Sequence, residues 1–161
     1  MIYHVRMVKK SYLLALLSLF IIISVTAASD EDPKTLIVYP PQAIFNASYA
    51  GDEETVRDIL VSGTDKNLRN SFGDTALHVA IFQENLTIVK LLLDYGFDPN
   101  AVAISNGNTP LHNAVASNNV AAARLLLQYG ANKNIRARNG QTPLDKARKE
   151  EKQDMVRLLY R

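Results

Sequence analysis

The chain has 161 residues, of which 47% are hydrophobic and 21% charged, a composition typical of one globular domain and unlike that of a disordered chain. It contains no cysteine, which excludes disulfide bonds, thiolate zinc sites and cysteine nucleophiles. The net charge of +2 combines 5 basic and 12 acidic residues between positions 29 and 100 with 9 basic and 4 acidic residues between 133 and 161. Because the body of the chain is acidic at one end and basic at the other rather than uniformly basic, we expect no nucleic-acid partner.

The first 28 residues have the three parts of a secretory signal peptide. The first ten residues include three basic ones and no acidic one, and the segment from 11 to 29 is uncharged and mainly aliphatic. Thr26-Ala27-Ala28 then fits a small-x-small cleavage site. We therefore expect residues 1–28 to be removed on export, and the rest to be secreted or to reside in a bacterial periplasm.

An uncleaved membrane anchor is the alternative interpretation of the same segment. Its uncharged run of 19 residues approaches the ~20 that a helix needs to span a bilayer. In either case the basic start stays in the cytoplasm and the body of the chain crosses the membrane. Contact with a membrane is expected only if the leader is retained. Residues 29–40 are predicted to be a linker, acidic at first and ending in proline.

The rest of the chain repeats two short motifs at intervals of 33 or 34 residues. The first motif occurs as Asp74-Thr75-Ala76-Leu77-His78-Val79-Ala80, Asn108-Thr109-Pro110-Leu111-His112-Asn113-Ala114 and Gln141-Thr142-Pro143-Leu144-Asp145-Lys146-Ala147. The second motif is aliphatic and occurs in step with the first, for example as Ile88-Val89-Lys90-Leu91-Leu92-Leu93 and Ala122-Ala123-Arg124-Leu125-Leu126-Leu127. Glycine closes the first three copies, at Gly63, Gly96 and Gly130.

A period of 33 residues with Thr-Pro-Leu-His resembles the ankyrin repeat. The resemblance covers residues 41–161 and implies an all-α solenoid of stacked antiparallel helix pairs joined by hairpin-like loops. We expect four repeats, at about 41–72, 73–106, 107–139 and 140–161. The first copy lacks the motif and the fourth has Asp145 in place of the histidine, so both are expected to cap the stack.

The physical properties of the motif agree with this resemblance. A threonine hydroxyl can cap the start of a short helix, and Pro110 and Pro143 suit the first helical position, where no amide donor is needed. Leu111 and Ala114 share one helix face, since they lie three residues apart. The closing glycines suit the left-handed position after a helix. Each repeat is thus predicted to be a helix pair that must stack on its neighbours to bury its apolar faces.

Two histidines in equivalent positions, His78 and His112, could be imagined as a metal pair. No third ligand of suitable type accompanies them, and the resemblance implies that each histidine bonds near its own threonine and the neighbouring loop. The sequence also contains no glycine-rich phosphate loop and no nucleophile elbow. We therefore expect no catalytic residue, no metal and no cofactor, and we do not expect an enzyme.

In ankyrin-like stacks the first helices and the loop tips line one surface, here called the concave face. Exposed aromatic residues with polar surroundings are frequent anchors of interfaces, although Phe82 could instead simply cover the adjacent repeat. The predicted protein-binding residues are Tyr49, Arg69, Phe72, Val79, Phe82, Gln83, Ile104, Asn113, Ser117, Arg136, Arg138, Lys146 and Lys149.

These patterns favour a non-catalytic protein–protein interaction module. The leading hypothesis is a monomeric, exported adaptor or inhibitor-like binder that uses its concave face on a protein partner of unknown identity. The alternative is a membrane-tethered structural scaffold that keeps its leader as a single-pass anchor. The identity of the partner does not follow from the fold, since these repeats accept many ligands.

Overall fold

The computed structural model of the protein describes residues 38–160. Within this range the chain forms eight helices of seven to nine residues and no strand. None of these helices is long and apolar enough to cross a membrane. The predicted leader and all but the end of the predicted linker lie outside the described residues. The helices are α1 Ala43–Ala50, α2 Glu53–Val61, α3 Ala76–Phe82, α4 Leu86–Asp94, α5 Pro110–Ala116, α6 Val120–Gln128, α7 Pro143–Lys149 and α8 Gln153–Tyr160.

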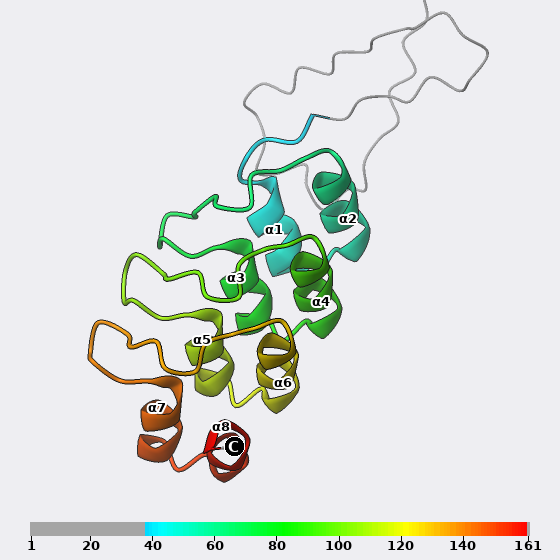
Figure 1. Ribbon diagram of the computed structural model, residues 1–161. Coiled ribbons are helices and arrows are strands. Elements are labelled where there is room, and N and C mark those ends of the chain that lie inside the picture. The colour runs from blue at the N-terminus through cyan, green and yellow to red at the C-terminus, as the bar shows by residue number, and fades with distance from the viewer. Residues whose placement is uncertain (1–37, 161) are drawn as a thin grey trace, which may run out of the picture. The chain divides into compact units, whose positions relative to one another are not determined.

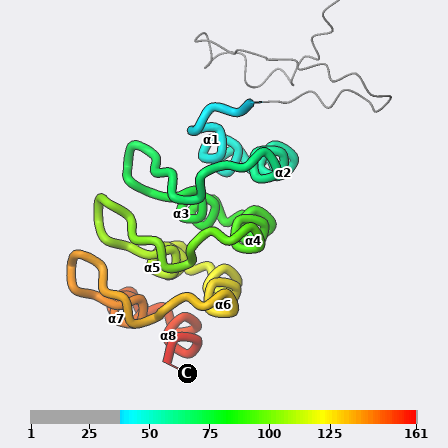
Figure 2. The backbone as a smooth tube through the Cα atoms, turned by 45° about the horizontal axis from the view of Figure 1, so that its top comes forward, coloured from blue at the N-terminus to red at the C-terminus, as the bar shows by residue number. Residues whose placement is uncertain are grey.

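The helices from residue 39 onward form two layers of a solenoid (Figure 1). The first helices of the four pairs stack on one another in the order α1, α3, α5 and α7. The second helices stack in the same way in the order α2, α4, α6 and α8. Long loops leave the second helices and extend past the layer of first helices on one side before the next pair begins (Figure 2). This arrangement confirms the predicted all-α solenoid of stacked helix pairs.

Threonine begins three of the first helices, as the motif predicts. Thr75, Thr109 and Thr142 are the N-cap residues of α3, α5 and α7, and each has the extended backbone that is typical of this position. Proline occupies the start of α5 and of α7. In α1 the N-cap is Gln42, whose side chain makes no capping hydrogen bond.

A left-handed residue lies between the two helices of every pair, which lets the chain reverse within two or three residues. This residue is Gly51, Glu84, Asn118 or Glu151, with φ between 55° and 72°. In the second and third pairs an asparagine follows and caps the next helix. The Asn85 side chain accepts a hydrogen bond from the Ile88 amide at 3.0 Å, and the Asn119 side chain accepts one from Ala122 at 2.9 Å.

The core is continuous through the stack. Leu77, Leu92, Leu111 and Leu126 are fully buried, and they belong to one cluster of buried residues that extends from α1 to α8. Because each apolar face is covered by the neighbouring pair, stability comes from interfaces between repeats. The layer of first helices and the loops beside it are thereby held as one surface.

Candidate protein-binding face

Two buried histidines hold the loops in position behind the concave face. The ring of His78 accepts hydrogen bonds at Nδ1 from the Thr75 amide, at 3.3 Å, and from the Thr75 hydroxyl, at 2.7 Å. Its Nε2 lies 3.1 Å from the Asn108 carbonyl oxygen, to which it can donate. His112 repeats this arrangement with Thr109 and, at 3.0 Å, with the Gln141 carbonyl oxygen. Each histidine therefore joins the start of its own helix to the next loop.

These contacts require neutral imidazole rings, since Nδ1 must accept while Nε2 donates. Burial lowers the pKa of His78 to about 4, and the pKa of His112 is lowered for the same reason. Both rings are almost fully buried. Their hydrogen bonds give both histidines a structural role, in which each ring joins a helix start to the next loop. Within residues 38–160 no group of three histidine, aspartate or glutamate side chains is arranged to hold a metal ion.

Asp145, at the equivalent position of the fourth repeat, bonds to its own threonine as the two histidines do. Its carboxylate accepts hydrogen bonds from the Thr142 amide, at 3.0 Å, and from the Thr142 hydroxyl, at 2.8 Å. These bonds lower the pKa of the Asp145 carboxyl. A carboxylate has no donor comparable to Nε2, and Asp145 instead lies 3.6 Å from the guanidinium of Arg136.

The loop tips stack on one another beside the first helices. The Ile104 amide donates to the Gly73 carbonyl at 3.1 Å, and the Arg138 amide donates to the Asn106 carbonyl at 3.0 Å. Gly73 must be glycine in this setting. Its φ is 79°, and an added Cβ would lie only 2.5 Å from Cβ of Ile104. The tips therefore form a continuous ledge along the stack.

Equivalent positions on the first helices change in character from repeat to repeat. Tyr49, Phe82, Ala116 and Lys149 are exposed at the ends of α1, α3, α5 and α7. This column begins with two aromatic rings, 67% and 70% exposed, and ends with a cation. The concave face thus runs from aromatic in the first two repeats to basic in the fourth.

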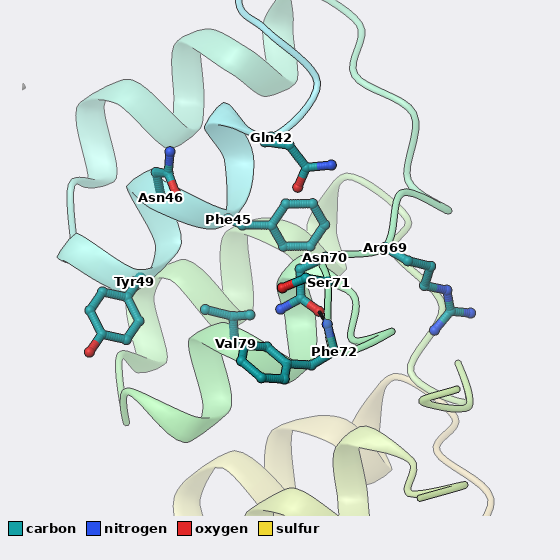
Figure 3. A pocket seen from close by; sticks show the side chains of 9 residues that line it. All are labelled: Gln42, Phe45, Asn46, Tyr49, Arg69, Asn70, Ser71, Phe72 and Val79. Atoms are coloured by element: carbon teal, nitrogen blue, oxygen red, sulfur yellow. Dashed lines mark hydrogen bonds between the residues drawn. The ribbon is translucent and has the colours of Figure 1, made fainter. Parts of the chain in front are cut away.

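A cleft of about 640 Å³ opens on this face between α1, the first loop and α3. Figure 3 shows the rings of Phe45 and Phe72 together with Val79 along one side of the cleft, while Tyr49 lies at the opposite edge. Phe45 is 5% exposed, whereas Phe72 is 70% exposed. The remaining lining residues are polar: Gln42, Asn46, Arg69, Asn70 and Ser71. The cleft therefore combines apolar walls with a rim of amide, hydroxyl and guanidinium groups.

The structure brings four predicted binding residues into this cleft, namely Tyr49, Arg69, Phe72 and Val79. None of the thirteen predicted residues is buried. The exposed ones are Tyr49, Phe72, Phe82, Ile104, Arg136, Arg138 and Lys149, and the half-buried ones are Arg69, Val79, Gln83, Asn113, Ser117 and Lys146.

Two of the predicted arginines also hold the ledge together. The Arg69 guanidinium donates to the Val102 carbonyl at 2.9 Å, and the Arg138 guanidinium donates to the Ser105 carbonyl at 3.3 Å. Sequence reasoning missed these contacts because they join residues of neighbouring loops. It also left Phe45, Asn70 and Ser71 out of the predicted site, and only the placement of the first loop against α1 reveals them.

The cations of the last repeat differ in how far they are already paired. Lys146 lies 2.7 Å from the Glu150 carboxylate, and Lys152 lies 2.6 Å from it. Lys149 is exposed and forms no ion pair in the described part of the chain. The charge of Lys149 is therefore accessible to a partner.

Comparison with known proteins agrees with this architecture. The family model for ankyrin repeats in three copies matches residues 44–137, more than half of the chain. The chain belongs to the ankyrin-repeat family. Ankyrin repeats are in general a non-enzymatic protein-interaction fold, so this chain carries a protein–protein interaction module.

The proteins to which this chain is similar are diverse. It is 37% identical over 73 residues to the transient receptor potential cation channel subfamily V member 5 of Oryctolagus cuniculus, and 35% identical over 57 residues to a protein of Treponema pallidum (strain Nichols) named for its ankyrin repeats. It is 45% identical over 53 residues to an L-asparaginase of Dirofilaria immitis. These matches cover 43%, 35% and 33% of this chain but only 10%, 19% and 9% of the relatives. The similarity is thus confined to a segment of each relative.

Proposed function

We propose that this chain is an exported, non-catalytic binder of a protein partner, which it engages with its concave face. The cleft beside Tyr49 and Phe72 carries the proposal. Two largely exposed aromatic rings are costly to leave in water and are frequent anchors in interfaces. Export is proposed from the pattern of residues 1–28 alone.

The charges of the concave face support a partner that carries acidic groups. Beyond the aromatic first half, Arg136, Arg138 and Lys149 are exposed on the last loop and on α7. A partner that spans the face would therefore place an apolar side chain near Phe72 or Phe82 and acidic groups against the fourth repeat. Charge complementarity of this kind mainly accelerates association, whereas buried aromatic anchors slow dissociation.

Capture with paired variants tests the proposed face. Protein isolated from its native compartment is used as bait, as wild type, as Phe72→Ser and as Tyr160→Ser. Tyr160 is a matched control, because it is 73% exposed on α8, in the layer of second helices. We expect Phe72→Ser to weaken capture of the same partner by about 30-fold, the effect of removing a hot-spot residue, and Tyr160→Ser to leave it unchanged.

The opposite result would place the interface elsewhere. A second, shallower cleft of about 410 Å³ lies between α4 and α6, among residues that include Leu86, Lys90 and Arg124. If Lys90→Glu with Arg124→Glu abolished capture while Phe72→Ser did not, the second helices would form the interface. The concave assignment would then be wrong.

A further inference from the structure

Two loop tips contain the dipeptide Asn-Gly, at Asn106-Gly107 and Asn139-Gly140. In this dipeptide the glycine nitrogen can attack the side-chain carbonyl of the asparagine, because glycine has no Cβ to hinder the approach. The reaction requires the peptide plane between the two residues to rotate, so that the nitrogen reaches Cγ of the asparagine. The surroundings of each tip therefore decide how readily the reaction occurs.

The Asn106-Gly107 tip is held by the following loop. The Arg138 amide donates to the Asn106 carbonyl at 3.0 Å, which fixes the peptide plane that would have to rotate. The Gly107 backbone also packs closely, since an added Cβ would lie 2.7 Å from the Arg138 nitrogen. Rotation at this tip must break an interaction between repeats.

The Asn139-Gly140 tip has only local bonds. The Asn139 side chain accepts from the Gln141 amide at 3.0 Å, and the Gly140 amide donates to the Ala137 carbonyl at 2.9 Å. Apart from Gly140 itself and the residues on either side of it, no heavy atom lies within 4 Å of the place where a Cβ of Gly140 would be. Within residues 38–160 no amide donates to the Asn139 carbonyl. Rotation at this tip breaks nothing beyond the turn itself.

We propose that Asn139 is a site of spontaneous deamidation in the folded protein, and that the equivalent Asn106 is protected. The Gly140 nitrogen loses its proton to solvent base and bonds to Cγ of Asn139, after which Nδ2 takes a proton from solvent, the Cγ–Nδ2 bond breaks and ammonia leaves. Water then opens one of the two imide C–N bonds of the succinimide and leaves aspartate or isoaspartate. The net reaction consumes one water molecule and needs no oxidant or reductant.

The product changes the charge of the tip that carries Arg136 and Arg138. Two positive charges between residues 136 and 140 become a net single positive charge once position 139 is a carboxylate. If the proposed function holds, this modification weakens the attraction of the last repeat for an acidic partner. The chemistry itself does not depend on any partner.

Mass-spectrometric peptide mapping after incubation of the folded full-length chain at mildly alkaline pH tests the proposal. We expect the peptide that contains Asn139 to convert to the acid forms about tenfold faster than the peptide that contains Asn106, since one further hydrogen bond and a close contact protect the latter. In concentrated guanidinium chloride the two peptides should convert at similar rates. Equal rates in the folded protein, faster conversion at Asn106, or a difference that persists in denaturant would each overturn the proposal. A failure to find any partner would affect only the proposed function.

Discussion

At the scale of single residues, the buried histidines make the stability of this protein dependent on pH. The folded pKa of His78 is about 4, below the ordinary value of 6.5. Between these two values the unfolded chain binds a proton that the folded chain does not, so acid favours unfolding. The contribution of neutral His78 to the free energy of unfolding is therefore fully present above pH 6.5 and is lost as the pH falls toward 4.

We therefore expect the free energy of unfolding to fall by about 2 kcal/mol between pH 7 and pH 5 on account of His78. His112, whose pKa is also lowered, acts in the same direction. Urea titrations at both pH values measure the difference. In His78→Asn the loss between pH 7 and pH 5 should be smaller than in the wild type. An identical loss in both proteins would mean that His78 titrates in the folded state as it does in the unfolded chain.

Ser48 is a local defect in the core of the first repeat. Its side chain is fully buried, and its hydroxyl has no hydrogen-bond partner within the described part of the chain. The equivalent positions in the next two repeats are Ile81 and Val115, both fully buried. A buried hydroxyl without a partner costs free energy because it has given up its bonds to water.

Removing this hydroxyl should stabilise the protein. We expect Ser48→Ala to raise the free energy of unfolding by about 1 kcal/mol, as measured by urea denaturation. Ser117 provides the control, because its hydroxyl donates to the Asn113 carbonyl at 3.1 Å. Ser117→Ala should be neutral or slightly destabilising. A loss of stability in Ser48→Ala would imply that the hydroxyl is bonded after all.

At the scale of helices, the fourth repeat is attached to the stack in its own way. Its second helix follows Lys152, where the other repeats have Asp52, Asn85 or Asn119 as the capping residue. The Lys152 ammonium instead donates to the Val115 and Ala116 carbonyls, both at 2.6 Å, at the end of α5. A cation at this position adds hydrogen bonds to carbonyl groups at the carboxyl end of a helix, where the helix dipole favours positive charge.

Lys152→Met should therefore loosen the last helix pair, since it keeps the aliphatic stem and removes the donor. We expect amide hydrogen exchange in α7 and α8 to become about tenfold faster or more, the effect of losing one or two charged hydrogen bonds, while exchange in α3 stays the same. Lys149→Met is the control, because Lys149 is exposed. Unchanged protection in Lys152→Met would show that apolar packing alone holds the fourth repeat.

The helices themselves were predictable because their signals are local. Thr75 and Pro110 mark helix starts within one turn, and Gly96 takes the left-handed conformation that its place after a helix predicts. The contacts of Lys152 and Arg138 were not predictable in this way. Each reaches a carbonyl oxygen more than thirty residues away, and such a partner is known only once the repeats are in register.

At the scale of the whole molecule, the period of the sequence was enough to predict the solenoid, because stacking is the way such repeats bury their apolar faces. It also placed the predicted binding residues on first helices and loop tips. It did not predict that Phe45 and Phe72 would border one cleft. That arrangement depends on how far the first loop folds back over α1, which no local pattern encodes.

The division of the concave face into an aromatic part and a basic part predicts separate effects on binding kinetics. Once a partner is identified, Phe82→Ala should speed its dissociation by about tenfold or more, because exposed aromatic anchors are buried only in the complex. Lys149→Glu should instead slow association at low ionic strength and matter little at high salt, since steering by exposed charges is screened. Surface plasmon resonance at two salt concentrations separates the two effects, and Lys66→Glu, on an exposed residue of the first loop, controls for net charge. If Phe82→Ala altered only the association rate, or Lys149→Glu only the dissociation rate, the partner would not span the face in this orientation.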